Sequence, residues 1–175
     1  MKTKSIRVVF LLLIVPASLF AQEKTGKEQK EAQKLELQKQ VESLLNSKNF
    51  VFVGGMAYPQ GGRSINLTTR PNFVKYGTEL IECDMPFFGR VYSGGGYGGS
   101  DAGLNFSGKP DEFTITAKKK GFLVVVAVKG LGDSYKLTMD AGNDGHAMLS
   151  ISSNTRSTIS YSGVIMPPDR PEDKK

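Results

Sequence analysis

The side chains best suited to chemistry lie in a glycine-rich stretch, residues 86–107. Its polar and aromatic members include Arg90, Tyr92, Tyr97, Ser100 and Asp101. Glycine permits unusual backbone angles and the close approach of another group, and a long loop in a compact domain is either functional or disordered. Two interpretations remain open. The stretch is either a ligand-binding or lid loop with Tyr stacking surfaces and Arg90 or Asp101 as polar anchors, or a tight irregular loop with tyrosines packed beneath it.

A second candidate begins at the turn predicted for Gly61-Gly62, after which Arg63 opens a strand that contains Asn66. An unpaired charge is costly out of water, so a buried Arg63 would need a carboxylate partner. Asp101 is one candidate partner, and an Arg63–Asp101 ion pair would brace two loops of the protein. Alternatively, Arg63 binds the carboxylate of a substrate. The predicted ligand-binding residues are Arg63, Asn66, Arg90, Tyr92, Tyr97, Ser100 and Asp101.

No catalytic residue is predicted, and no metal or cofactor is expected. One Cys and one His exclude a Cys-based zinc site and any site that needs two histidines. His146 follows a turn and is expected to be partly exposed, and Cys83 is expected to be a buried apolar residue. A phosphate-binding loop would need a following helix and a Lys with Ser or Thr, which the glycine-rich stretch lacks. A carboxylate-dependent hydrolase is kept as an alternative. Against it, the acidic residues fall mainly at turns or on polar strand faces, and nothing in the sequence assigns two of them to one cleft.

The first 21 residues have the layout of a secretory signal peptide. Lys2, Lys4 and Arg7 precede a short apolar run, and small residues lead to a cut expected after Ala21. Cleavage would remove three basic residues and halve the formal net charge of +6, which argues against a nucleic-acid partner. We therefore expect an exported protein, periplasmic or associated with the cell envelope, with no membrane span after cleavage.

The elements that position these residues follow from periodicity. Residues 22–48 are charged, and Leu37, Val41, Leu44 and Leu45 mark one face of a helix expected over residues 27–47 and docked on the domain. Residues 49–166 form an antiparallel β domain, and residues 167–175 a disordered tail.

About nine short strands with short connections fit an antiparallel sheet. The strand Phe50–Val53 is expected to end at Gly54-Gly55. Gly77-Thr78 is expected to form a two-residue hairpin turn. Phe122–Val128 is expected to be a central strand covered on both faces. The predicted fold is mainly β, either an antiparallel barrel of lipocalin-like form or a two-sheet sandwich, preceded by one N-terminal α-helix.

Three motifs resemble a known family when taken together in this order: residues 61–68 (GGRSINLT), 87–92 (FFGRVY) and 97–103 (YGGSDAG). The chain resembles the uncharacterised exported domain-of-unknown-function family 4251 of the Bacteroidota, over about residues 50–165. The resemblance implies export, a helix and a β-rich domain, and it carries no catalytic residue with it.

These observations favour an exported, non-catalytic domain that binds a small ligand, a glycan or an envelope protein. Two alternatives remain from other classes of function. One is the carboxylate-dependent hydrolase, and the other is a structural or assembly protein of the envelope that docks through its N-terminal helix.

Overall fold

The computed structural model describes residues 26–67, 72–92, 103–130 and 132–168. In this part of the chain one helix is followed by ten strands. They are α1 (Gly26–Asn46), β1 (Phe50–Pro59), β2 (Ile65–Asn66), β3 (Phe73–Tyr76), β4 (Ile81–Met85), β5 (Leu104–Gly108), β6 (Pro110–Lys118), β7 (Gly121–Lys129), β8 (Ser134–Ala141), β9 (His146–Ser153) and β10 (Ile159–Met166). The predicted mainly β fold with an N-terminal helix is confirmed.

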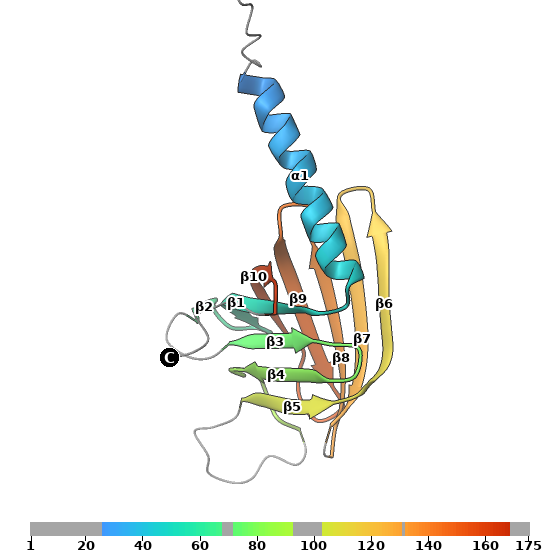
Figure 1. The fold of residues 1–175 in the computed structure, drawn as a ribbon. Coiled ribbons are helices and arrows are strands. Elements are labelled where there is room, and N and C mark those ends of the chain that lie inside the picture. The colour runs from blue at the N-terminus through green and yellow to red at the C-terminus, as the bar shows by residue number, and fades with distance from the viewer. Residues whose placement is uncertain (1–25, 68–71, 93–102, 131, 169–175) are drawn as a thin grey trace, which may run out of the picture.

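The strands form one antiparallel sheet that curls into a nearly closed barrel of nine strands. Their order is β5-β4-β3-β1-β10-β9-β8-β7-β6, and β2 lies beside β1. The first long strand therefore pairs with the last, with Val51 opposite Met166. The two edges, β5 and β6, are consecutive in the chain and are joined by Lys109 alone. In Figure 1 strands β3 to β5 cross β6 to β9 at a steep angle. The barrel is thus the observed form of the two predicted architectures.

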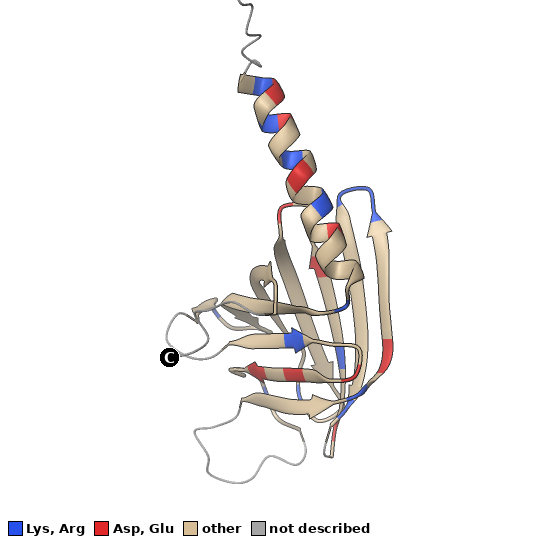
Figure 2. Ribbon diagram, viewed as in Figure 1, with Lys and Arg blue, Asp and Glu red and all other residues tan. Residues whose placement is uncertain are grey.

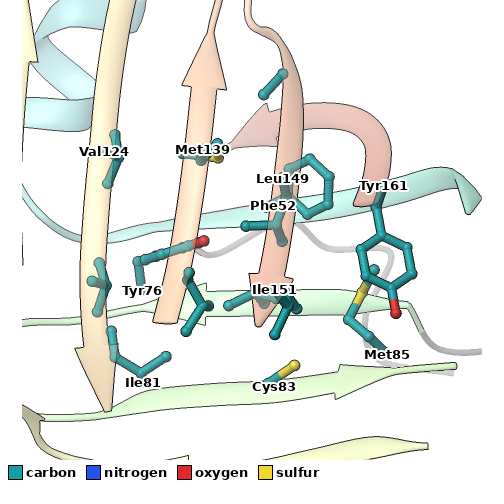
Figure 3. Close-up of a cluster of buried hydrophobic side chains, with 14 of the residues drawn as sticks. Phe52, Tyr76, Ile81, Cys83, Met85, Val124, Met139, Leu149, Ile151 and Tyr161 are labelled. Atoms are coloured by element: carbon teal, nitrogen blue, oxygen red, sulfur yellow. The ribbon is translucent and has the colours of Figure 1, made fainter. Parts of the chain in front are cut away.

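Period-two alternation directs one face of each strand into the barrel. In β8, Tyr135, Leu137 and Met139 are buried, while the residues between them face outward. The largest fully buried side chains are Leu45, Phe50, Phe52, Tyr76, Ile81, Met85, Leu104, Leu137, Met139, Leu149, Ile151 and Tyr161. Figure 3 shows members of this set from opposite walls meeting in the interior. Aromatic and branched side chains thus pack the interior.

Strand β1 does not end at Gly54-Gly55, so that prediction is wrong. The strand continues to Pro59, and its register against β10 shifts between Gly54 and Met56. A Cβ atom on Gly54 would lie 3.0 Å from the Met85 side chain, so glycine allows the bulged strand to approach its neighbours. The glycine pair marks a bulge within one long strand.

The predicted two-residue turn at Gly77-Thr78 is also wrong. Strand β3 ends at Tyr76 and β4 begins at Ile81, so four residues connect them. Lys75 then lies opposite Glu82. This register keeps Val74 and Tyr76 of β3 on the same buried face as Ile81 and Cys83 of β4.

Strand β7 is not a central, doubly covered strand, contrary to the prediction. It lies beside the edge strand β6, and its outward residues Leu123, Val125 and Ala127 are half-buried. Apolar residues on both faces therefore indicate a partly exposed apolar outer surface at this position.

Helix α1 docks through its last turns, as expected. Val41 and Leu45 are buried in the same cluster as Phe50. The first half projects away from the barrel, with Leu35 54% and Leu37 40% exposed (Figure 1). No helix in the described ranges has both the length and the apolar character needed to cross a membrane.

Candidate functional site: the loop anchor and the β4–β5 pocket

The structure places the predicted binding residues in two regions. Arg63 lies in the exposed turn between β1 and β2, and Asn66 ends β2 opposite Met56. Arg90 and Tyr92 lie in the exposed segment that follows β4, and Tyr92 is 67% exposed. The other predicted members, Tyr97, Ser100 and Asp101, lie outside the described residues, as does the proposed Arg63–Asp101 pair.

The segment around Val91 is held against the loop between β9 and β10. The Tyr92 N–H donates to the Thr155 carbonyl at 2.7 Å, and the Ser157 N–H donates to the Arg90 carbonyl at 2.9 Å. The Ser157 hydroxyl, in a buried residue, accepts from the Arg90 N–H at 2.9 Å. These bonds fix the chain where it enters residues 93–102.

Arg156 fixes the other end of the same stretch. Its Nη1 donates to the Gly103 carbonyl at 2.9 Å, and its guanidinium lies 5.3 Å from the centre of the Phe87 ring. A half-buried cation beside an aromatic face and a carbonyl is well accommodated. Residues 90–92 and Gly103 are therefore both bonded to residues 155–157, and these bonds together form the loop anchor.

Arg156 is not among the binding residues predicted from the sequence. The available signal was a short polar loop between two clearly alternating strands with one cation in it. That signal is weak, since many surface loops share it. The partner of Arg156 is a backbone carbonyl far away in the chain, which no side-chain pattern records.

Asp133 stabilises the loop that carries Arg156. Its carboxylate accepts from the Thr155 hydroxyl at 2.5 Å and from the N–H groups of Ser134 and Asn154 at 2.8 and 3.1 Å. Partial burial disfavours the charge, but these bonds and one from Ser153 outweigh it and lower the pKa of Asp133. The carboxylate therefore serves as a charged cap for the 153–156 loop.

A surface pocket of about 400 Å³ lies along β4 and β5. Its lining comprises Glu82, Cys83, Asp84, Asn105, Phe106, Ser107 and Tyr135. The outer faces of the two strands provide two cross-strand pairs, Asp84 opposite Asn105 and Glu82 opposite Ser107. Figure 2 shows the positions of the acidic residues along β4. The arrangement places hydrogen-bonding groups of four kinds of side chain side by side.

Most of these polar groups are available to a ligand. Glu82 has an ion pair with Lys75, with Nζ and Oε2 at 3.4 Å. Within the described ranges, Asp84, Asn105 and Ser107 have no side-chain hydrogen bond or ion pair. The pocket thus combines a carboxylate, an amide and a hydroxyl group that are not engaged by the described part of the chain.

The aromatic side of the pocket is rigid. Phe106 and Tyr135 stack with ring centres 3.8 Å apart and planes within 6°. Burial, and the negative charge of Asp133, raise the pKa of Tyr135, so the phenol remains neutral at neutral pH. Both rings are buried in the core, because Phe106 alternates along β5 with the exposed Asn105 and Ser107, so the stack backs the strands that carry the polar pairs.

Two further predictions are confirmed. Cys83 is a buried free cysteine, and burial together with the neighbouring Asp84 raises the pKa of its thiol. His146 is exposed at the start of β9. In the described ranges no group of three or more His, Cys, Asp or Glu side chains is arranged to hold a metal ion.

Comparison with known proteins identifies the family. No curated protein matches the chain. The crystal structure of a DUF4251 family protein from Bacteroides eggerthii DSM 20697 is similar, with a TM-score of 0.60 and 19% sequence identity, over 78% of this chain and 91% of that one. At this identity the likeness concerns the fold. The model of the family described as "Domain of unknown function (DUF4251)" matches residues 32–165, and the chain therefore belongs to that family.

Proposed function

We propose that this protein is an exported, non-catalytic domain that binds a hydroxyl-rich ligand, such as a glycan, in the β4–β5 pocket. The observation that carries the proposal is that one pocket holds the polar groups of Asp84, Asn105 and Ser107, which no described residue engages. Sugar hydroxyls both donate and accept, so a carboxylate, an amide and a hydroxyl group suit them together. The export signal expected at residues 1–21 would bring the pocket into contact with envelope glycans.

The rigidity of the pocket supports the same class of ligand. Binding sites rely on a few oriented polar groups. The cross-strand pairs lie on two hydrogen-bonded strands that hold them at fixed spacing, and the buried Phe106–Tyr135 stack packs behind β5. A pre-formed site loses little conformational entropy on binding.

The experiment is a binding titration of the purified protein against soluble peptidoglycan fragments and a panel of neutral oligosaccharides. Two-dimensional NMR gives shifts at individual residues, and calorimetry gives the affinity. We expect shifts that cluster on β4 and β5, and at least a ten-fold loss of affinity in Asp84→Ala, because one or two hydrogen bonds are lost.

The matched control is Asp140→Ala, which removes an exposed carboxylate from the outer face of β8. It leaves the binding constant unchanged if the β4–β5 pocket is the site. Absence of binding across the panel, or equal loss in both variants, contradicts the proposal.

A hydrolase remains the second candidate, because Glu82 and Asp84 both line the same pocket. Two carboxylates that flank a glycosidic bond are the usual machinery of glycoside hydrolysis. The ion pair of Glu82 with Lys75 favours binding, since it occupies one of the two carboxylates. Chromatography of the glycan panel after incubation distinguishes the two, because only a hydrolase yields shorter products that Asp84→Asn abolishes.

A further inference from the structure

Strand β6 is an open edge of the barrel. It is nine residues long and, in the described part of the chain, pairs only with β7. Most of its residues are exposed. An exposed, regular edge presents unpaired backbone groups to any strand that fits beside it.

The hairpin at the end of β6 determines which backbone groups face outward. Lys118 lies opposite Gly121 across a two-residue turn, and such a closing pair is hydrogen-bonded. From Glu112 to Lys118 the register has no shift, so the even-numbered residues bond to β7. The odd-numbered residues Ile115 and Ala117 therefore direct their N–H and C=O groups away from the barrel.

One contact agrees with the outward direction of the odd-numbered backbone groups. The Lys48 Nζ donates to the Phe113 carbonyl at 3.1 Å from outside the sheet. A carbonyl has two acceptor positions, so this bond leaves Phe113 able to accept from a further strand. Elsewhere in the described ranges no hydrogen bond occupies the outward backbone groups of Ile115 and Ala117.

We propose that β6 pairs antiparallel with β6 of a second copy of this chain, about a two-fold axis at Ile115. Each Ile115 then exchanges two backbone hydrogen bonds with its counterpart, and Phe113 lies opposite Ala117 of the other copy. All three positions are hydrogen-bonded pairs in this register. The large ring of Phe113 faces the smallest side chain of the strand, which suits close pairing on the inner face.

Charge complementarity selects a second copy as the occupant. The same register places Glu112 directly opposite Lys118 of the other copy, twice per dimer, in pairs that are not hydrogen-bonded and so bring side chains closest. Figure 2 shows the acidic start of β6 and the basic turn at its far end. Because a two-fold axis reverses the strand, acidic and basic ends meet.

Within one copy, Lys118 and Glu112 make only weak contacts that the pairing between copies can replace. Lys118 has an ion pair with Asp140 at the surface, with 39% and 58% of the two side chains exposed. Among the described residues, Glu112 accepts one long side-chain hydrogen bond, 3.4 Å, from the Thr114 hydroxyl. Exposed contacts of this kind contribute little and are readily exchanged.

The first test is the oligomeric state of the purified protein by sedimentation equilibrium over a concentration series. We expect a reversible dimer whose dissociation constant rises at least ten-fold in Ile115→Pro, because both central hydrogen bonds lose their donor. Proline is tolerated there by β6 itself, since this N–H makes no bond to β7. Ile115→Val keeps the N–H and leaves the constant unchanged. A monomer at all concentrations, or a dimer whose dissociation constant is unchanged in Ile115→Pro, overturns the proposal.

A cross-link keeps the proposal testable if the proline variant fails to fold. A hydrogen-bonded antiparallel pair has Cα atoms about 5.5 Å apart, within disulfide reach. Under oxidising conditions Ile115→Cys therefore forms a covalent dimer. Thr116→Cys is the matched control, because its two copies are displaced along the strands beyond that reach. Equal yields from both variants overturn the register.

Charge reversal tests the register without a cross-link. Glu112→Lys and Lys118→Glu each place like charges opposite one another and weaken the dimer several-fold. The double variant restores opposite charges and returns dissociation to near the original value. Failure of the double variant to recover overturns the pairing of Glu112 with Lys118.

Discussion

Replacing Tyr76 with phenylalanine should make this protein more stable. Tyr76 is 2% exposed, and its hydroxyl has no hydrogen-bond partner in the described part of the chain. Its ring stacks on Phe50 with centres 4.5 Å apart and lies 6.1 Å from Phe113. Phenylalanine keeps those ring contacts and removes only the unsatisfied oxygen. Figure 3 shows that hydroxyl directed into the interior.

The magnitude follows from the cost of a buried unpaired polar group, about 1–3 kcal/mol. Since the vacated space is one oxygen atom, the cavity it leaves offsets part of that gain. We expect Tyr76→Phe to raise the free energy of unfolding by about 1–2 kcal/mol. For a domain of this size the Tm rises by roughly 2–4 °C for each kcal/mol.

Tyr161 provides the matched control. It is equally buried, but its hydroxyl donates to the Pro86 carbonyl at 2.8 Å. Tyr161→Phe removes a satisfied hydrogen bond and should lower the free energy of unfolding by about 1 kcal/mol or more. The same chemical change therefore has opposite signs at two positions.

The assay is urea unfolding of both variants and the parent, followed by circular dichroism, with thermal scans alongside. Equal m-values show that the comparison concerns stability alone. Loss of stability in Tyr76→Phe would refute the reasoning, because it would show that the hydroxyl has a stabilising partner.

Three other perturbations give clear expectations. Burial raises the pKa of Cys83 above its ordinary 9.0, and of the two core tyrosines above 10.0, so the folded state retains protons that the unfolded chain releases. The free energy of unfolding should therefore be constant below about pH 9 and fall as the pH rises further. Urea titrations at neutral and alkaline pH measure this change, and a free energy of unfolding that does not fall at alkaline pH would contradict the expectation. Leu45→Ala should cost about 2–5 kcal/mol in the same assay, whereas Leu37→Ala, 40% exposed, should cost under ~0.5 kcal/mol, and equal losses would refute the docking. Asp133→Ala should cost about 1–2 kcal/mol and accelerate amide exchange at Asn154, and unchanged exchange there would contradict the capping role.

The strand pattern could be predicted from alternation, since a barrel wall imposes a buried and an exposed face on each strand. The strand end predicted at Gly54-Gly55 was wrong because glycine is common both in turns and in β-bulges. The close approach of Met85 to Gly54, which indicates a bulge, depends on a distant strand and is not visible in the local sequence. The apolar outer face of β7 misled because the sequence of a strand does not reveal whether a second layer covers its outer face.

The loop anchor and the pocket could not be predicted for a related reason. Arg156 bonds to the carbonyl of Gly103, and Asp84 lies opposite Asn105, so each pairing depends on the register of distant segments. Residue type alone drew attention to Arg90 and Tyr92. These two do lie at the loop anchor, but there they act through backbone bonds that any residue except proline could make.

The pairing of β1 with β10 has a kinetic consequence. The first strand of the barrel is completed by the last, so its wall cannot close until nearly the whole chain is available. Contacts of such long sequence separation slow folding, because the loop entropy is lost before the contacts form. While the chain is still emerging from a ribosome or a translocation channel, the barrel would therefore remain open, and the chain could still pass through a narrow channel. Truncation before Ile159 should leave β1 with an unpaired side and the domain unable to reach its closed state.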